Sequence, residues 1–165
     1  MRVIKLGLIS TIAFALLITG ISLFFPSHVR ISKAIDISSG RDSLLVLLQD
    51  ARNWKKWYPG ADTASFVFIE GKIKGISTGE MQGLMIIAVS DSNVIAENID
   101  PGSKRGETGW NIFPGSIPNT VTVQWYRDFY FRWYPWEKFS SLLLEKRYGP
   151  QMEQGLDRLK RILEK

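Results

Sequence analysis

The fold of this chain is decided by the stretch Pro150–Leu163, which reads PQMEQGLDRLKRIL. Its apolar residues recur at helical spacing, and its charged residues lie on the opposite side of the same helix. The apolar face is formed by Met152, Gly155, Leu156, Leu159, Ile162 and Leu163. This pattern is typical of a surface helix that packs one face on a sheet. The sequence therefore predicts a long C-terminal helix laid on a sheet formed by the residues before it.

Short strands separated by turns make up most of the preceding chain. Val29–Ile37 alternates between apolar and polar positions, which indicates a strand with one buried face. Two short helices are predicted next, one carried by Leu44–Leu48 and one by Asn53–Trp57. Further strands are predicted at Phe66–Glu70, Lys72–Ile76, Leu84–Val89, Val94–Ile99, Thr108–Phe113 and Thr120–Phe131. Strands at this spacing, joined by tight turns, indicate an antiparallel sheet of about six or seven members.

A separate helix is predicted at Trp136–Arg147, because Pro135 suits the first turn of a helix and Gly149 suits its end. Pro150 would then open the C-terminal helix. The order of strand, short helices, antiparallel strands and long helix is that of an α+β fold. A curved sheet that grips an apolar helix leaves space between the two, and that space is the natural site for a ligand.

The N-terminal stretch Leu6–Phe25, LGLISTIAFALLITGISLFF, contains no charged residue. A helix of that length spans about 30 Å, which is the thickness of the hydrocarbon core of a bilayer. The alternative interpretation of this stretch is a cleavable signal peptide. Its apolar core is longer than the ~7–15 residues usual in signal peptides, and no small-x-small cleavage site precedes Pro26. We expect residues 1–26 to be a transmembrane anchor and residues 27–165 to be one domain.

The basic residues around the apolar stretch bear on its orientation. Arg2 and Lys5 favour a cytoplasmic N-terminus for a single-pass protein, although Arg30 and Lys33 reduce the asymmetry of charge. We expect the domain to lie outside the cytoplasm, in the periplasm of a cell with two membranes.

The composition excludes several functional classes. Arg2 and Lys5 carry two of the five excess positive charges, which leaves +3 for the domain, without the clustered Lys and Arg of a nucleic-acid binder. The absence of Cys excludes disulfides, thiolate nucleophiles and Cys-based metal sites. His28 is the only His, which leaves a zinc site poorly supplied. We expect no metal, no cofactor and no nucleic-acid partner.

The segment Trp125–Phe139 is the densest feature, because nine of its fifteen residues are aromatic. Three interpretations remain open for it: the wall of an apolar pocket, the filling of a core, or contact with lipid headgroups. Arg127 interrupts the apolar face. It either meets a ligand carboxylate or phosphate, or lies in a bulge or in solvent. Trp54 and Trp57 share one helical face and either pack under the sheet or gate a cavity.

The run Asp50–Pro59, DARNWKKWYP, together with Val29–Ile37 and Leu44–Leu48, is similar to the opening of the SRPBCC superfamily. That group holds START lipid-transfer domains, birch-pollen-allergen-like proteins and the polyketide cyclase/dehydrase and lipid-transport proteins. Thr120–Trp125 resembles the last long strand of the family and Pro150–Leu163 its closing helix. The resemblance implies a helix-grip fold around a hydrophobic cavity, with members that are enzymes, ligand carriers or binders of partner proteins.

The expected function follows from this resemblance and from the aromatic segment. We expect a membrane-anchored domain that binds a hydrophobic or amphipathic small molecule, of lipid or polyketide type, between the sheet and the C-terminal helix. The candidate cavity residues are Trp57, Met85, Trp110, Trp125, Arg127, Phe129, Met152 and Leu156.

Two alternatives belong to other classes of protein. A small cyclase or hydrolase would need a buried carboxylate or Tyr facing the cavity. A protein-interaction module at the membrane would need a filled core and an exposed apolar patch. The sequence contains no nucleophile elbow and no phosphate-binding loop, so we assign no catalytic residue.

Overall fold

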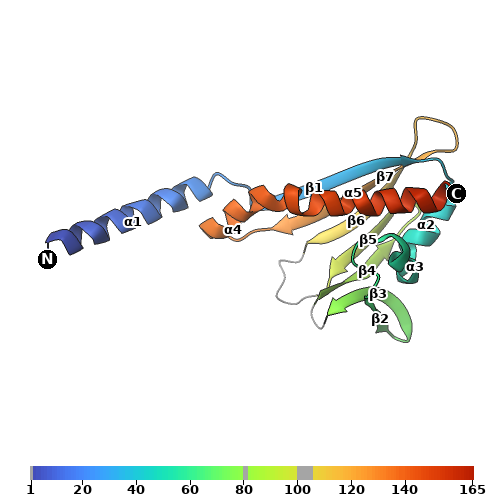
Figure 1. Ribbon diagram of the computed structural model, residues 1–165, viewed down its shortest axis with the longest axis horizontal. Helices are drawn as coiled ribbons and strands as arrows, with labels where there is room; N and C mark the ends of the chain where they lie inside the picture. Colours follow the sequence, from blue (N-terminus) through green and yellow to red (C-terminus); the bar gives the residue numbers. More distant parts are fainter. Residues whose placement is uncertain (1, 80–81, 100–105) are drawn as a thin grey trace.

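Seven antiparallel strands and a long C-terminal helix form the domain that follows an N-terminal helix in the computed structural model (Figure 1). The structure describes residues 2–79, 82–99 and 106–165. In chain order the elements are α1 (Arg2–Ser22), β1 (His28–Ile37), α2 (Arg41–Gln49), α3 (Ala51–Trp57), β2 (Ser65–Ile69), β3 (Lys72–Gly79), β4 (Gln82–Val89), β5 (Asn93–Asn98), β6 (Glu107–Pro114), β7 (Val121–Tyr130), α4 (Pro135–Ser140), a 3-10 turn (Ser141–Leu143) and α5 (Leu144–Leu163).

The sheet has the order β1-β7-β6-β5-β4-β3-β2, and every neighbouring pair is antiparallel. β2 to β7 form a simple meander, and β1 closes the sheet by pairing with β7. The helices α2 and α3 make the connection from β1 at one edge of the sheet to β2 at the other. The predicted α+β helix-grip fold is confirmed, and each predicted strand is present with small shifts at its ends.

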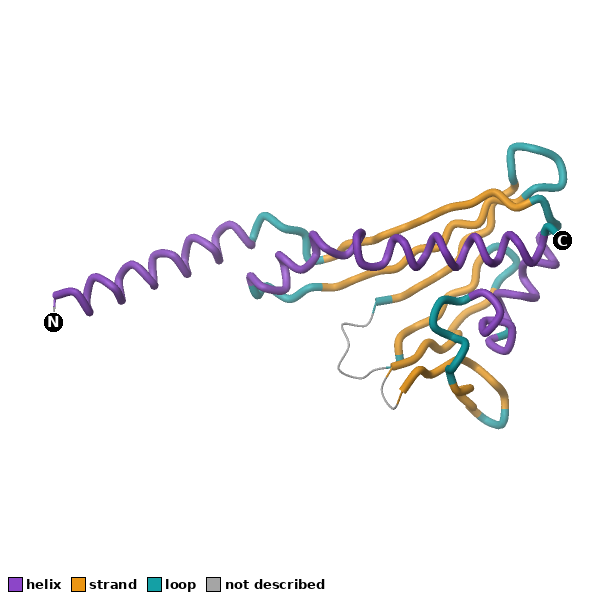
Figure 2. Tube along the Cα trace, in the orientation of Figure 1, coloured by secondary structure: helices purple, strands orange, loops and turns teal. Residues whose placement is uncertain are grey.

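β1 and β7 pair along the whole length of both strands, from His28 opposite Tyr130 to Ile37 opposite Val121. α5 runs along this pair on one face of the sheet, as the red helix in front of β1 and β7 shows (Figure 1). The tube view shows α2 and α3 near the far end of α5, next to the C-terminus (Figure 2). The core lies between the sheet and these three helices.

The apolar face predicted for the C-terminal helix is the face that α5 buries. Met152, Leu156 and Leu159 are each at most 2% exposed. α3 contributes Trp54 and Trp57, which are fully buried. Both Trp side chains are therefore held between α3 and the sheet.

The boundary predicted between two C-terminal helices is wrong. α5 begins at Leu144 and continues through Gly149 and Pro150 without a break, and α4 is only six residues long. Pro150 removes one helical hydrogen bond, but packing holds the helix on both sides of it. Lys33 of β1 pairs with Glu145 at 2.7 Å and with Glu153 at 2.8 Å, one carboxylate before the proline and one after it.

α1 projects away from the domain (Figure 1). It is long and apolar enough to cross a membrane, which is true of a membrane anchor and of a signal sequence, and its apolar stretch is not buried against the domain. α1 ends at Ser22, so five residues connect it to β1.

Gly155 permits the close approach of α5 to the sheet. A Cβ atom at this position would lie 2.7 Å from the Trp125 ring and 2.9 Å from Cδ of Pro59. Trp125 has no room to move, because it is 2% exposed and packed among other aromatic rings. The helix can therefore contact Trp125 at this depth only with a glycine.

We expect Gly155→Ala to lower the free energy of unfolding by about 1–3 kcal/mol, because overpacking outweighs the better helix propensity of Ala. Urea denaturation of the full chain in mild detergent, followed by tryptophan fluorescence, measures this change. Gln154→Ala, at the exposed neighbouring position, is the control and should change the free energy by less than about 0.5 kcal/mol. Equal stability of the Gly155→Ala chain would contradict the close packing described here.

Candidate functional site

An aromatic cluster fills the centre of the domain between α3, the sheet and α5. It consists of Trp54, Trp57, Tyr58, Trp110 and Trp125. Neighbouring ring centroids are 5.3–6.4 Å apart. Such separations are those of edge-to-face and offset contacts, which stabilise aromatic packing beyond the area buried. The rings therefore act as core at this position.

Hydrogen bonds fix several of these rings. The indole N–H of Trp54 donates to the Leu48 carbonyl at 2.8 Å, and that of Trp125 donates to Oγ1 of Thr108 at 2.8 Å. Trp110 differs, because its buried Nε1 has no partner within the described residues. The cluster is thus held by β6 on one side and by the last turn of α2 on the other.

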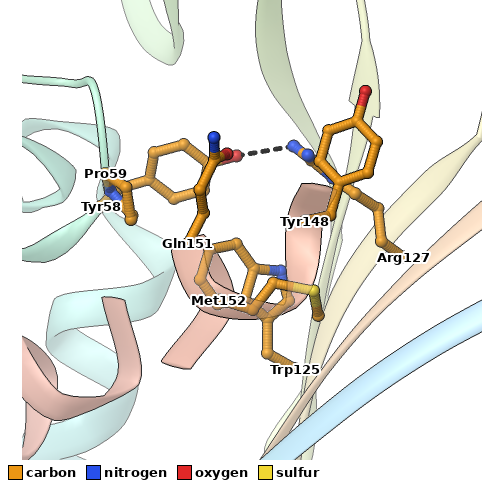
Figure 3. A pocket seen from close by; sticks show the side chains of 7 residues that line it. All are labelled: Tyr58, Pro59, Trp125, Arg127, Tyr148, Gln151 and Met152. Carbon is orange, nitrogen blue, oxygen red and sulfur yellow. Dashed lines mark hydrogen bonds between the residues drawn. The ribbon is translucent and has the colours of Figure 1, made fainter. Parts of the chain in front are cut away.

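A small polar pocket opens beside the cluster, between β7, the end of α3 and α5 (Figure 3). Its lining residues are Tyr58, Pro59, Trp125, Arg127, Tyr148, Gln151 and Met152. The cavity measures about 10 Å³, which is close to the smallest volume that holds one water molecule. In this structure the pocket is closed to anything larger.

Arg127 is the charged residue of this pocket. Its Nη2 donates a hydrogen bond to Oη of Tyr58 at 2.8 Å, and its guanidinium carbon lies 5.2 Å from the centre of the Tyr148 ring. Its Nε is buried and has no hydrogen-bond partner among the described residues. The seven lining residues include no carboxylate, so the positive charge is unneutralised where it faces the pocket.

The position of Arg127 is that of a regular strand residue. It pairs with Ile31 of β1 and Thr108 of β6 without a register shift, so no bulge turns the side chain away. Arg127 is half-buried and lies on the same face of β7 as Val123 and Trp125. An oxygen-bearing ligand would satisfy its free donor directly.

Burial raises the pKa of the Tyr58 phenol above its usual range, and the neighbouring Arg127 opposes that rise only in part. The phenol is therefore neutral at physiological pH and accepts the Arg127 hydrogen bond as a hydroxyl. Its own proton remains available for a second acceptor in the pocket. Arg127 and Tyr58 together offer two donors to a polar group of a ligand.

The structure brings together only part of the predicted set of cavity residues. Trp125, Arg127 and Met152 line the pocket, and Phe129 lies beside it, with its ring 4.9 Å from that of Tyr148.

The other predicted residues lie away from the pocket. Trp57, Trp110 and Leu156 are in the packed core. Met85 is half-buried and alternates with the buried Leu84 and Ile86, so it faces the opposite side of the sheet.

Sequence reasoning missed four lining residues. Tyr58 and Pro59 belong to the DARNWKKWYP run, in which only the two Trp residues were considered as contributors to a cavity. Tyr148 lies on α5 three residues before Gln151 and four residues before Met152. Residues at this spacing share a helical face. Because the sequence predicted that one helix ends at Gly149 and another begins at Pro150, Tyr148 and Met152 were assigned to different helices.

A second polar cluster lies on the opposite face of the same strands. Asp128 is 2% exposed and accepts two hydrogen bonds from Arg30, at 2.7 and 2.6 Å. Nε2 of His28 lies 2.9 Å from the same carboxylate, and its ring stacks on Tyr130 at 4.7 Å. Hydrogen bonds from Arg30 lower the pKa of Asp128 below its ordinary value, with a smaller contribution from His28. Asp128 is thus an ionised partner of Arg30, separated by the sheet from the pocket.

An open depression of about 550 Å³ lies between the α2–α3 junction and the β2–β3 hairpin. It is lined by Gln49, Asp50, Arg52, Phe68, Gly71, Lys72 and Ile73. Asp50 caps α3 by accepting from the Arg52 backbone and also pairs with the Arg52 side chain at 2.6 Å. This acid and base already neutralise one another at the surface.

Comparison with known proteins identifies what this fold resembles. Residues 28–164 match the family described as "Polyketide cyclase / dehydrase and lipid transport". No curated protein matches the sequence.

Solved structures with the same fold are similar to this chain at low sequence identity. A START superfamily protein from Mycobacterium smegmatis aligns with a TM-score of 0.61 and 13% identity, covering 82% of this chain and 97% of its own. Norcoclaurine synthase from Thalictrum flavum, solved as a point mutant with a transition-state analogue, gives 0.61 and 11%, with 82% and 94% covered. The di-domain aromatase/cyclase StfQ of the steffimycin pathway gives 0.63 and 10%, with 83% of this chain and 51% of that protein covered. Identities this low establish the fold alone.

We expect Asp128→Asn to lower the free energy of unfolding at neutral pH by about 1–3 kcal/mol, because a buried carboxylate loses its charge-assisted bonds to Arg30. The folded-state pKa of Asp128 is depressed, so its contribution is present above the unfolded pKa and is lost as the pH falls through the folded pKa. The difference between wild type and variant should therefore shrink at acid pH. Urea titrations at several pH values measure it.

Asp62→Asn, at an exposed position, is the matched control and should have little effect at any pH. A difference between wild type and Asp128→Asn that stays constant down to the lowest pH would show that the charge of Asp128 does not stabilise the fold.

Proposed function

Because this chain belongs to the polyketide cyclase/dehydrase and lipid transport family, we propose that it binds an amphipathic molecule whose acidic or carbonyl head meets Arg127. The family points to a ligand-binding or cyclase/dehydrase type of domain. The observation that carries the proposal is the buried, unpartnered Nε of Arg127 beside the pocket formed with Tyr58 and Gln151. An unpaired donor on a partly buried charge is costly, and a ligand oxygen would remove that cost.

We place the apolar part of the ligand along the apolar residues that follow Arg127 in the chain. Phe129 follows Arg127 on the same face of β7, and Phe131 comes directly after the end of the strand. Both are partly buried against the core. This row leads from the pocket to Ser27, whose carbonyl accepts from the Phe131 N–H at 2.7 Å, and so to the end of α1. A ligand placed this way would keep its head at Arg127 and its tail towards α1.

Entry requires the pocket to open. The present cavity of about 10 Å³ holds no ligand of this size. Tyr148 lies against Arg127, and Gln151 lies beside Tyr58 at the same pocket (Figure 3). Tyr148 is half-buried and Gln151 is exposed, so both side chains can change rotamer without disturbing the Trp cluster. The ligand would replace the contact of Tyr148 with Arg127.

Binding is favoured over catalysis by the chemistry of the lining. General acid–base catalysis needs a group that titrates near the working pH. The lining has Arg127, the neutral phenol of Tyr58 and the Tyr148 side chain. The buried Asp128 lies on the opposite face of the sheet, paired with Arg30. The residues around the pocket can therefore hold a polar group more readily than they can move protons.

We further propose that α1 anchors the domain of residues 27–165 as a single-pass protein, with the domain outside the cytoplasm. The length and apolar composition of α1 support a membrane span, and Arg2 and Lys5 support a cytoplasmic N-terminus. An amphipathic ligand would then come from the same membrane or from a compartment next to it.

A protein-interaction module is the second candidate. The observation that favours it is the filled aromatic centre, in which Trp54, Trp57 and Trp110 are each fully buried. Such a domain would use its exposed surface and not its interior. The two functions predict different results in the following experiment.

We expect Arg127→Met to lose a ligand adduct that wild type retains. Native mass spectrometry of the full chain, purified in mild detergent, compares the bound mass in the two proteins and identifies it after denaturation. A charge-assisted hydrogen bond is worth roughly 1.5–3 kcal/mol, so the affinity should fall at least about tenfold. Lipids bound to α1 are common to both proteins and cancel in the comparison.

Lys146→Met removes an exposed charge from α5 and is the matched control, which should keep the adduct. The same adduct on wild type and Arg127→Met would refute the role of Arg127. If neither protein carries an adduct or binds added oleic acid or phosphatidic acid, ligand binding is excluded and the protein-interaction module is favoured.

A further inference from the structure

An exposed apolar surface lies at the end of the domain that adjoins α1. It is formed by Trp133, Trp136, Phe139, Leu142 and Leu143, which we call the α4 surface. Trp133 and Trp136 are 61% and 69% exposed, and the two leucines are exposed to a similar extent. The other four Trp residues of the chain are at most 2% exposed. The two exposed Trp side chains are therefore exceptional in this protein.

α4 is attached directly to the segment that follows α1. Nζ of Lys138 donates to the Phe25 carbonyl at 2.9 Å and to Oγ of Ser27. The ring of Phe139 packs edge-on against Phe25 with 5.2 Å between centroids. Ser22, the last residue of α1, is fully buried. Figures 1 and 2 show α4 at the end of the domain from which α1 projects.

The length of α1 sets the depth at which α4 would lie. Its 21 residues span about 31 Å at 1.5 Å per residue, which matches the hydrocarbon core of a bilayer. If α1 crosses that core, Phe24 and Phe25 lie at the boundary with the headgroups. The contacts of Lys138 and Phe139 with Phe25 then hold α4 at the same depth.

The chemistry of the α4 surface fits that boundary. Trp133, Tyr134 and Trp136 form an aromatic stack with centroid distances of 4.8 and 4.9 Å. Trp and Tyr are enriched at membrane–water interfaces, because their rings combine an apolar body with a polar group. The Arg132 backbone N–H donates to Glu137 at 2.7 Å, which fixes the chain that enters α4. The stack is thus held by the fold before any lipid is present.

We propose that the α4 surface inserts into the headgroup–acyl boundary of the bilayer that α1 spans, as a second and interfacial membrane contact of the domain. The inference rests on the membrane anchoring proposed for α1 and is independent of the ligand at Arg127. It commits to lipid because Phe139 packs on Phe25, directly after α1, and the neighbouring Phe24 is also exposed. A second copy of the chain is the other possible occupant.

Tryptophan quenching tests the proposal on the full chain. The protein is reconstituted into phosphatidylcholine vesicles, in which part of the lipid carries bromine on the acyl chains close to the carbonyl group. α1 contains no Trp, so all emission comes from the domain. We expect brominated lipid to quench a part of the emission in wild type, and we expect this quenching to be lost in Trp133→Phe/Trp136→Phe.

An added reporter controls for distance from the membrane. Ile117→Trp, in the Trp133→Phe/Trp136→Phe background, places an exposed Trp in the β6–β7 loop, at the end of the domain away from α1 (Figure 1). Aqueous acrylamide should quench this reporter and brominated lipid should not. The control shows that exposure alone does not give lipid quenching.

Each remaining outcome overturns the proposal in a recognisable way. If acrylamide but not brominated lipid quenches Trp133 and Trp136, the α4 surface faces water while α1 remains an anchor. Protection of both residues from both quenchers would assign the surface to a second copy of the chain. If alkaline washing strips wild type from the vesicles, α1 does not anchor the protein and both proposals fail.

Discussion

The pairing of β1 with β7 positions the other features of this domain. β1 is the first element after α1, and β7 is the last strand before α4 and α5. Ten residues of β1 pair in continuous register with β7, so two segments about a hundred positions apart in the chain are fixed side by side. This pairing brings Asp128 to Arg30 and His28 on one face and turns Arg127 towards α5 on the other.

The two faces of β7 separate two kinds of electrostatic environment. On the outer face, the charge of Asp128 is matched by Arg30, and Nε2 of His28 lies within hydrogen-bond distance of the same carboxylate. This cluster stabilises the strand pair. On the inner face, Arg127 has the Tyr58 hydroxyl as its partner, and its Nε has no acceptor among the residues that the structure describes. Adjacent residues of one strand thus have opposite roles: Asp128 is a satisfied structural charge, and Arg127 is a charge that lacks a full set of partners. This contrast makes Arg127 the better candidate for ligand binding.

Local patterns in the sequence predicted the elements of the fold well. Alternation and turn residues identified the strands, and the apolar face of Pro150–Leu163 identified the part of α5 that packs on the sheet. The helix boundary at Gly149–Pro150 could not be predicted from the same rules, because contacts distant in sequence, such as those of Lys33 with Glu145 and Glu153, maintain the helix there. The candidate site was predictable only in part. Arg127 was identified as a charge on an apolar face. The volume of the pocket beside it could not be predicted, because that volume depends on how the Trp side chains pack and the sequence pattern does not determine this packing.

The short connection between α1 and β1 limits where the domain can act. Five residues separate the two elements, a reach of about 17 Å when fully extended, and backbone and side-chain bonds at Ser27 restrict it further. With α1 in a bilayer, the connection is too short for the domain to cross the aqueous space to another membrane. A molecule taken up at Arg127 would be exchanged with the adjacent leaflet or handed to a soluble acceptor that arrives there. If both proposals hold, the domain would extract or present its ligand locally and would not carry cargo between two membranes.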